Sequence, residues 1–355
     1  MRIGNKLAKT GSSNTYLFYQ IMNLALDAMG GDNAPSVNVL GAKAALNLYP
    51  KIKRIFLVGD GPTLEAECAK HQLDREKITI VHSTEVISMA EPGAKSVRRK
   101  KNSSINVAMD LVKSGNADAF ISAGNTGACV ASATIKLRMI DGIDRAGIAS
   151  PLPNEHGVCN ILDAGANPEA KPEHLVAYAI MGTAFAKHVL GIKDPIVGLM
   201  SNGEEDEKGT TFTKETFALL KEAHGINFIG NVEGHDLFDT PLHVVLCDGF
   251  TGNIVLKSCE ATAKAMGKWL KQELTANPLR ALGAAMAKGA FKALKEKSSY
   301  ESYGGCPLLG VNGVVIIAHG SSSALAIQNA LRVGMETAEN KVNEAIRAAL
   351  ATPVA

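Results

Sequence analysis

LALDAMGGDNAP, residues 24–35, is a short apolar run that reaches an aspartate and then two adjacent glycines. We expect a strand over residues 23–26, a turn at the glycines, and a helix over residues 37–48, where apolar residues recur at helical spacing. Adjacent glycines let backbone amides approach a ligand closely, and the amino end of a helix favours an anion. The stretch therefore predicts a strand–turn–helix unit, with a purely structural turn as the alternative.

The same pattern recurs along the chain. Short β-rich runs end in turn residues and are followed by helical patterns; the further expected strands cover residues 54–58, 78–82, 119–122, 159–162, 196–200, 244–247 and 314–317. Strands that alternate with helices indicate a largely parallel sheet with helices on both faces. Ligands of such sheets gather beyond the carboxyl ends of the strands. We therefore expect the turns to meet at one edge.

The turns share one chemistry, because small residues accompany Asp, Asn, Ser or Thr. The stretches are SAGNTGA (122–128), LDAGAN (162–167), SNGEEDEKGT (201–210) and CDGFTGN (247–253). Backbone amides beside such side chains suit a phosphate or an oxyanion, although Asn125 or Thr126 alternatively serves only as a helix N-cap. The candidate phosphate- or substrate-binding residues are Asp27, Gly30, Gly31, Asp32, Asn33, Ser122, Gly124, Thr126, Gly127, Asp163, Gly165, Asn167, Ser201, Asn202, Gly203, Gly249, Thr251 and Gly252.

Nucleotide and metal motifs are missing from the sequence. Neither G-x-G-x-x-G at the opening turn nor G-x-x-x-x-G-K-[ST] anywhere supports a dinucleotide or ATP site. The four acids at residues 204–207 more often form a solvated face, and no histidine sits at ligand spacing. We therefore expect no metal and no cofactor.

Composition narrows the class of protein. The chain has 355 residues, 46% hydrophobic residues and a net charge of +2, which is ordinary for a soluble globular protein and offers no global attraction for nucleic acid. The nearest of its six cysteines, Cys247 and Cys259, are twelve residues apart, so there is no zinc motif. We expect reduced thiols in a cytoplasmic protein.

The expected organisation is one α/β catalytic domain over residues 22–340. Residues 1–21 form an extension that is disordered or not native, and residues 341–355 form a tail. A helical hairpin at about residues 254–303 interrupts the domain and is split at Asn277-Pro278. Because the hairpin is basic and amphipathic, its alternatives are subunit pairing, a membrane surface, an acidic protein, or a packed pair with solvated lysines.

Two further features carry charge or proton chemistry. His319 follows an apolar strand in AHGSSS, where it is either structural or a general acid/base or oxyanion group. A basic run is either a solvated face or a site for phosphate or an acidic partner; its core residues are Arg98, Arg99, Lys100 and Lys101.

Seven motifs in order resemble the PlsX-type phosphate acyltransferases of bacterial phospholipid synthesis. They are ALDAMGGDNAP, SAGNTGA, LDAGAN, SNGEEDEKGT, NVEGHDLF, CDGFTGN and GGCPLLGVNG with AHGSSS. Each motif alone is weak, but together they run from about residue 23 to about residue 332. The extension before Met22 is the one departure from the family pattern, and it concerns the start site.

The resemblance implies a fold, a reaction and partners. The fold would be a three-layer α/β/α sandwich with a largely parallel, mixed sheet, similar to phosphotransacetylases and isocitrate dehydrogenase-like enzymes, plus the protruding hairpin. An acyl group would pass reversibly from acyl-[acyl carrier protein] to inorganic phosphate. A homodimer without metal is implied, in the cytoplasm and in peripheral contact with the inner membrane face. The acyl phosphate would serve a membrane glycerol-3-phosphate acyltransferase.

Roles for particular residues follow from this resemblance. Phosphate is itself a nucleophile, so the site must orient it and stabilise an oxyanion. Phosphate or oxyanion contacts fall to Asn125, Thr126, Thr251 and Asn253, proton handling to His319, orientation to Asp27, Asp163 and Asp248, and carrier docking to residues 98–101. The competing hypotheses are a short-chain acyl transferase that uses coenzyme A and a non-catalytic, membrane-associated scaffold.

Overall fold

The computed structural model describes residues 7–8, 17–18, 21–298, 301 and 303–351. The chain divides into two compact units: unit 1 is Met1–Ala146, His188–Gly191 and Gly304–Thr352, and unit 2 is Gly147–Lys187, Ile192–Tyr303 and Pro353–Ala355. Most of the expected extension, residues 1–21, lies outside the described residues; within it, β1 (Leu7–Ala8) pairs antiparallel with β2 (Leu17–Phe18). Within the described ranges, no helix is long and apolar enough to span a bilayer.

The sheet of unit 1 has the order β12-β13-β6-β3-β4-β5. All neighbours are parallel except β12, which runs antiparallel to β13. The bounds are β3 (Met22–Asp27), β4 (Ile52–Gly59), β5 (Ile78–His82), β6 (Ala119–Ser122), β12 (Cys306–Leu309) and β13 (Val314–Ile317). Five parallel strands, β13, β6, β3, β4 and β5, therefore end at the same edge of the sheet.

Helices cover both faces of this sheet, because successive strand side chains point to opposite faces and both sets include buried apolar residues. Leu24 and Leu26 pack in one core with α1 (Ser36–Leu48), α2 (Gly61–Lys70) and α12 (Ala324–Glu339). The alternate residues, such as Asp27, face the side where α4 contributes Ser104. The remaining helices are α3 (Gly93–Arg99), α4 (Ser104–Lys113), α5 (Thr126–Lys136) and α13 (Val342–Ala351), the last lying in the expected tail.

Unit 2 contains strands in the order β10-β9-β11-β8-β7. The strands are β7 (Gly147–Asn154), β8 (Gly157–Leu162), β9 (Ile196–Met200), β10 (Asn227–Val232) and β11 (Val244–Leu246), and all neighbours are parallel except β7 with β8. Packed around them are α6 (Pro172–His188), α7 (Thr211–Glu222) and α8 (Asp236–Asp239). The mixed, largely parallel sheets with helices on both sides confirm the predicted fold class.

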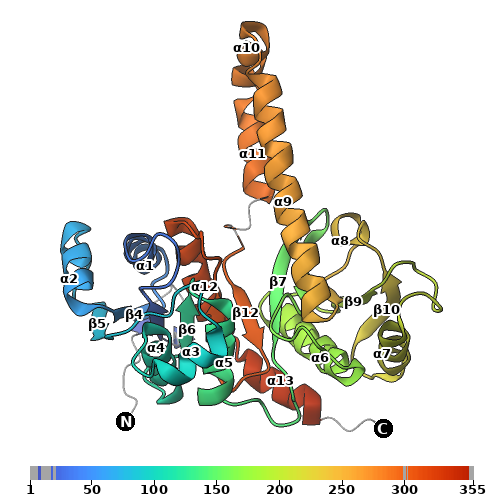
Figure 1. Ribbon diagram of the computed structural model, residues 1–355, viewed down its shortest axis with the longest axis horizontal. Coiled ribbons are helices and arrows are strands. Elements are labelled where there is room, and N and C mark those ends of the chain that lie inside the picture. Colours follow the sequence, from blue (N-terminus) through green and yellow to red (C-terminus); the bar gives the residue numbers. More distant parts are fainter. Residues whose placement is uncertain (1–6, 9–16, 19–20, 299–300, 302, 352–355) are drawn as a thin grey trace. The chain divides into compact units, whose positions relative to one another are not determined.

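Three helices form an arm that extends from unit 2 (Figure 1). We define the arm as α9 (Gly249–Leu274), α10 (Pro278–Met286) and α11 (Lys288–Ser298). Asn277 caps α10 by accepting the Arg280 N–H at 2.9 Å, and Pro278 occupies the first turn, as the sequence predicts. The second expected helix is divided between α10 and α11. No residue of α10 is buried, and Leu279 and Met286 are 80% and 84% exposed.

Candidate functional site

Three turns of unit 1 meet where β3, β6 and β13 end. We call them the first rim: residues 30–32, 122–126 and 319–321. The Asp32 N–H donates to the Gly320 carbonyl oxygen at 2.8 Å, and the Ala318 N–H donates to the Ser122 carbonyl oxygen at the same distance. These bonds join the first turn to the third and the third to the second. Residues almost 300 positions apart thus line one edge, as the strand–turn pattern predicts.

The double glycine of the opening stretch is required by close packing. A Cβ atom at Gly30 would lie 2.5 Å from Asp27 Oδ2 and 2.6 Å from the Gly124 nitrogen, and Gly31 has a φ of +102°. Sequence reasoning missed Asn38, which is fully buried on α1. Its Nδ2 donates at 2.9 Å to the carbonyl oxygens of Ala28 and Gly30 and so fixes the turn from beneath.

Asp27 braces the first rim from a buried position. Its side chain is buried, and its Oδ2 accepts a 2.7 Å hydrogen bond from the Ser122 hydroxyl while Oδ1 accepts the Met29 N–H. Burial raises the pKa of the Asp27 carboxyl, and these hydrogen bonds oppose the rise. Asp32 and Asn33, in contrast, are exposed on the turn.

Asn125 caps α5, which is the second of the two roles that the sequence allows. Its Oδ1 accepts the Ala128 N–H at 2.9 Å, and its Nδ2 donates to the carbonyl oxygens of Ser88, Met89 and Glu91 at 2.8–3.2 Å. The amide hydrogens are therefore engaged by the loop carbonyl oxygens, and a contact of Asn125 with phosphate or an oxyanion stays a prediction. The groups that α5 offers outward are first-turn backbone amides and the exposed Thr126 and Gly127.

His319 stands at the end of β13 with a defined ring orientation. Its Nδ1 accepts the Ser321 backbone N–H at 3.2 Å and lies 2.8 Å from the Ser321 hydroxyl. Because a backbone N–H can only donate, Nδ1 of the neutral ring carries no proton and Nε2 does. His319 thus brings an N–H donor to the first rim.

The second rim lies in unit 2, where the parallel neighbours β8, β11 and β9 end. Asp163, completely buried, accepts backbone N–H groups from Ile148, Gly165, Ala166 and Asn167 at 2.6–2.9 Å. Burial raises the pKa of its carboxyl, and the four donors, which favour the carboxylate, oppose this. Asp163 therefore organises the turn that the sequence singles out.

The first turn of α9 sits directly on the Asp163 turn. A Cβ atom at Gly252 would overlap the Asp163 carbonyl oxygen, and one at Gly249 would lie 2.6 Å from Asp163 Oδ2. Asp248 caps the helix: Oδ1 accepts the Phe250 and Thr251 N–H groups at 2.9 Å, and Oδ2 accepts the Thr251 hydroxyl at 2.6 Å. Asp248 thus fixes the first turn of α9, and its role in orienting a substrate stays a prediction.

Two asparagines of the second rim differ in their surroundings. Asn253 is exposed on α9, and its Cβ lies 3.6 Å from the Cβ position of Gly165, whose φ is +136°. Asn167, in contrast, donates from Nδ2 to the Tyr178 hydroxyl at 3.2 Å, which ties this turn to α6. Of these two asparagines, Asn253 is the one that is exposed.

The loop after β9 contains the remaining predicted residues. Asn202 is exposed, whereas Gly203 is buried and the Ser201 hydroxyl is shielded from solvent. Of these three, Asn202 presents a side chain outward.

The fold brings a histidine to the acidic loop, which the sequence spacing did not indicate. One ligand atom each from Glu204, His235 and Asp236 lie within 4.8 Å of one another. The Glu204 and His235 side chains are more than half exposed, and the Asp236 carboxylate already accepts the Glu233 N–H and the Thr240 hydroxyl. Because the buried Asp236 carboxylate already has hydrogen-bond donors, we assign no ion to the cluster.

The buried cysteines are poor nucleophiles. Burial raises the pKa values of Cys129 and Cys159 to about 12 and that of Cys247 well above its usual range. All six cysteines are free. None of the three cysteines Cys129, Cys159 and Cys247 is therefore available as a thiolate near neutral pH.

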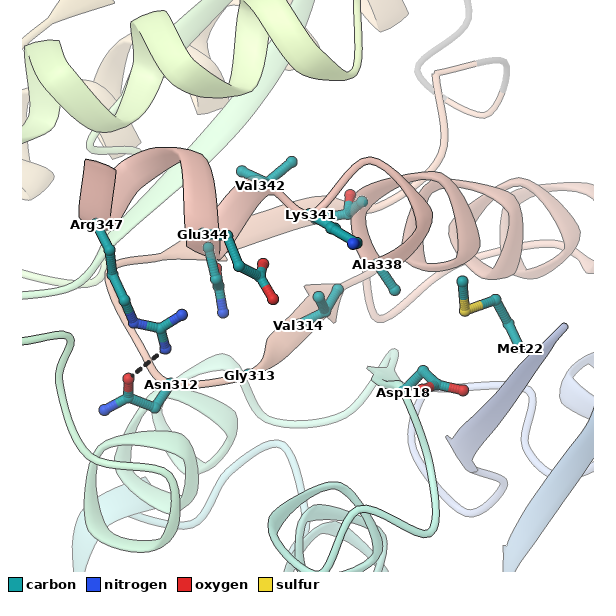
Figure 2. Close-up of a pocket in the computed structure, with 12 residues that line it drawn as sticks. Met22, Asp118, Asn312, Gly313, Val314, Ala338, Lys341, Val342, Glu344 and Arg347 are labelled. Atoms are coloured by element: carbon teal, nitrogen blue, oxygen red, sulfur yellow. Dashed lines mark hydrogen bonds between the residues drawn. The ribbon is translucent and has the colours of Figure 1, made fainter. Parts of the chain in front are cut away.

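A polar cavity of about 410 Å³ lies at the opposite edge of the unit 1 sheet (Figure 2). Met22 and Val314, where β3 and β13 begin, line it together with the first turn of α13. Arg347 donates to Asn312 Oδ1 at 2.8 Å across its wall. The cavity thus lies at the strand starts, away from the first rim.

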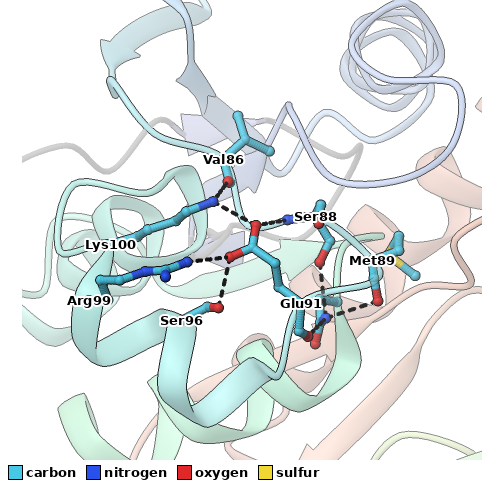
Figure 3. Close-up of polar contacts among 8 residues, drawn as sticks. Val86, Ser88, Met89, Glu91, Ser96, Arg99 and Lys100 are labelled. Carbon is cyan, nitrogen blue, oxygen red and sulfur yellow. Dashed lines mark hydrogen bonds and ion pairs between the residues drawn. The ribbon is translucent and has the colours of Figure 1, made fainter.

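The basic run is partly paired within the protein (Figure 3). The Lys100 ammonium lies 2.6 Å from Glu91 Oε1, and Arg99 donates to Glu91 Oε2 at 3.2 Å. Arg98 and Lys101 are exposed. Sequence reasoning missed Glu91 as the centre of this cluster, although a lone acid just before a basic run is a visible signal.

Solved structures with the same fold include phosphotransacylases. The structure superposes on a phosphotransacetylase from Staphylococcus aureus with a TM-score of 0.57 at 17% identity, covering 90% of this chain and 95% of that one. A branched-chain phosphotransacylase from Enterococcus faecalis gives 0.52 at 14% identity, covering 89% and 99%. The chain therefore has the α/β fold of these phosphotransacylases.

Sequence comparison narrows the class to a family. Residues 22–345 match the family model described as "Fatty acid synthesis protein", so the chain belongs to that family. The chain is 58% identical to a phosphate acyltransferase from Akkermansia muciniphila over 93% of its length and 96% of the relative. A phosphate acyltransferase from Pelotomaculum thermopropionicum is 49% identical over 93% and 95%. The chain is thus an acyltransferase, as the seven ordered motifs predict.

Proposed function

We propose that the protein transfers a fatty acyl group from acyl-[acyl carrier protein] to inorganic phosphate. A phosphate oxygen attacks the thioester carbonyl, the carbon–oxygen bond forms, and the carbon–sulfur bond breaks. The phosphate proton passes to the departing sulfur, so the products are acyl phosphate and the free carrier thiol. No electrons are gained or lost, and no cofactor is required.

The single observation that carries the proposal is the composition of the first rim. The amino end of the eleven-residue helix α5 begins beside the Gly30–Gly31 turn and His319. Helix N-termini and glycine turns bind phosphate through backbone N–H groups. The nearby thiol of Cys129 has a pKa of about 12, so phosphate rather than cysteine is the nucleophile that this rim suits.

His319 and Thr126 are the proposed ligand-facing side chains of the first rim. The Nε2–H of His319 would donate a hydrogen bond to the oxyanion that forms on the thioester carbonyl. The exposed Thr126 hydroxyl would donate to phosphate. Asn125, Asp27 and Ser122 hold the turns that carry these groups.

Carrier docking is proposed for the exposed part of the basic run. Acyl carrier proteins are acidic, and Arg98 and Lys101 are exposed next to the loop that Asn125 anchors. Arg99 is also exposed, whereas Lys100 is committed to Glu91 and to the Val86 carbonyl oxygen. Opposite charge steers association without fixing its final affinity.

We further propose that the arm joins two copies of the chain. Leu279, Leu282 and Met286 recur at helical spacing on α10 and are all more than 60% exposed. Exposed apolar stripes of this kind mark protein or membrane contacts. A cytoplasmic homodimer that touches the inner membrane face would deliver acyl phosphate to a membrane glycerol-3-phosphate acyltransferase. The double variant Leu282→Gln/Met286→Gln tests this by light scattering and by vesicle binding. A monomeric variant supports pairing of two copies. An unchanged mass together with lost vesicle binding favours a contact with the membrane alone.

The reaction is tested with purified full-length protein, inorganic phosphate and three donors: palmitoyl-carrier protein, palmitoyl-coenzyme A and acetyl-coenzyme A. Acyl phosphate is captured as the hydroxamate, and the released thiol is counted. We expect product from the carrier thioester. Product from acetyl-coenzyme A alone would favour the short-chain alternative, and no product from any donor would favour the scaffold.

A matched pair of variants on α5 tests the phosphate position. Thr126→Val should lower kcat/KM for phosphate about tenfold or more, since losing a hydrogen bond to a charged group costs about 1.5–3 kcal/mol. Thr134→Val is the control, because the Thr134 hydroxyl on the same helix donates to the Val130 carbonyl oxygen. Equal kinetics for the two variants would contradict the assignment.

A further inference from the structure

Glu91 receives four hydrogen bonds (Figure 3). Its Oε1 accepts from Lys100 Nζ at 2.6 Å and from the Ser88 N–H at 3.1 Å. Its Oε2 accepts from the Ser96 hydroxyl at 2.8 Å and from Arg99 at 3.2 Å. An isolated surface ion pair contributes little, but one carboxylate shared among four donors is a network.

This network closes the loop of residues 86–91 onto α3. Lys100 Nζ also donates to the Val86 carbonyl oxygen at 2.6 Å, and the Glu91 N–H donates to the Ser88 carbonyl oxygen at 3.2 Å. The two ends of the loop are thereby held by the same lysine. The Glu91 carboxylate therefore ties the loop to α3.

The closed loop presents three carbonyl oxygens to one side chain. Asn125 Nδ2 donates to the carbonyl oxygens of Ser88, Met89 and Glu91 at 3.1, 3.2 and 2.8 Å. The Oδ1 of the same amide accepts the Ala128 N–H. The amide that caps α5 is therefore oriented by the loop that Glu91 closes.

Close backbone packing makes this connection stiff. A Cβ atom at Gly93, the first residue of α3, would overlap the Ala128 nitrogen and the Gly127 carbonyl carbon. The start of α3 therefore rests directly on the first turn of α5. A displacement of the loop moves that turn as well.

We propose that Glu91 is a positioning residue that sets the phosphate-binding turn at the start of α5 through the loop and Asn125. This rests on the proposed function, because it assigns phosphate to that turn. Glu91 itself contacts no reacting atom. Its loss would weaken phosphate binding more than it affects the acyl donor.

The Glu91 network requires a charged carboxylate, and this carboxylate is ionised at neutral pH. Hydrogen bonds lower the pKa of the Glu91 carboxyl to about 2. The largest cause is the bond from the Lys100 ammonium, followed by those from the Ser88 N–H and the Ser96 hydroxyl. The arrangement therefore stays ionised throughout the neutral range.

The test compares Glu91→Gln with Glu339→Gln. The two glutamates are closely matched, because Glu339 Oε1 lies 2.6 Å from Lys51 and the two carboxylate side chains are 25% and 20% exposed. We expect Glu91→Gln to raise KM for phosphate at least about fivefold, the lower range of coupling between sites, while KM for the acyl donor changes little. Glu339→Gln should leave both constants unchanged.

Two further measurements make the result decisive. Lys100→Gln breaks the contact from the other side, so the double variant should raise KM for phosphate by less than the product of the single effects. Hydrogen exchange of the amides at residues 86–91 and 126–128 should accelerate in Glu91→Gln and not in Glu339→Gln. Unchanged exchange, or equal kinetics for the two glutamate variants, overturns the proposal.

The failure of this proposal differs from the failure of the proposed function. If the wild-type protein transfers no acyl group from any donor, the reaction is wrong. The positioning role of Glu91 can then still be tested by calorimetry, which measures the affinity of wild type and Glu91→Gln for inorganic phosphate, and by the exchange rates. Equal phosphate affinity in both proteins overturns it.

Discussion

The Ser122 hydroxyl donates a 2.7 Å hydrogen bond to Oδ2 of Asp27, a buried carboxylate 95 residues earlier in the chain. The bond joins the ends of β3 and β6, two parallel neighbours. Ser122 Oγ also accepts the Gly124 N–H at 2.9 Å. One hydroxyl therefore links the strand ends to the turn that precedes α5.

Removing this hydroxyl should destabilise the protein. Ser122→Ala removes one donor from the buried Asp27 carboxylate and the acceptor of the Gly124 N–H, which costs about 1–3 kcal/mol of unfolding free energy, measured by urea titration. Ser114→Ala, at an exposed serine that bonds locally to the Leu111 carbonyl oxygen, is the control and should change it by less than about 0.5 kcal/mol. Similar losses of unfolding free energy in both variants would contradict a stabilising role of the Ser122–Asp27 hydrogen bond.

Two glycines of α9 should respond oppositely to alanine. Gly252→Ala places a Cβ against the Asp163 carbonyl oxygen and should cost about 1–3 kcal/mol, whereas nothing lies within 4 Å of the Gly267 Cβ position. Gly267→Ala should therefore stabilise the protein by about 0.5–1 kcal/mol. Chemical denaturation measures both, and a stable Gly252→Ala variant would contradict the close approach.

Cys129→Ala should retain turnover. Burial raises the pKa of this thiol to about 12, so it does not form a thioester with the acyl group at neutral pH. In the native protein, iodoacetamide should leave Cys129 unmodified in a peptide map, while urea exposes it. Trapping of an acylated Cys129 would instead demonstrate covalent catalysis.

Charge reversal in the basic run should weaken carrier docking. Arg98→Glu and Lys101→Glu should each raise KM for the acyl-carrier substrate at low salt, and the difference from wild type should shrink as ionic strength shortens the screening length below about 10 Å. Lys113→Glu, at an exposed lysine that ends α4, serves as the control. A salt-independent effect would exclude electrostatic docking.

The Glu91 network should make the free energy of unfolding depend on pH in the acidic range. Its folded pKa is about 2, below the usual value of 4.5, so the unfolded chain binds more protons between these values. The stabilisation is therefore complete above about pH 4.5 and declines as pH falls toward 2. The difference in urea midpoint between wild type and Glu91→Gln should be smaller at pH 4 than at pH 7, and a constant difference would contradict this origin.

Local patterns were sufficient for the elements that position the first rim. The expected strand at 23–26 and helix at 37–48 correspond to β3, Met22–Asp27, and α1, Ser36–Leu48. The antiparallel strand β7, Gly147–Asn154, was not anticipated because Pro151 and Pro153 disfavour a strand. It forms by pairing with β8, a partner that local propensity does not encode.

Side-chain roles were less predictable than elements. Asn125 was identified, but its two possible roles differ only in what faces Nδ2, and the three carbonyl oxygens come from residues 88–91. Bonds to backbone carbonyls leave no residue-type pattern in a sequence. Asn38 offered a better signal, because a buried polar residue on the apolar face of a helix requires partners.

The contact between Gly93 and the start of α5 limits how this enzyme can diverge. Every other amino acid at position 93 would overlap the backbone of residues 127 and 128, which no rotamer change relieves. A lineage that replaced this glycine would have to alter the loop and the helix start together, since neither change alone restores the packing. Position 93 should therefore remain glycine in relatives that keep this loop, even where the neighbouring basic residues vary freely.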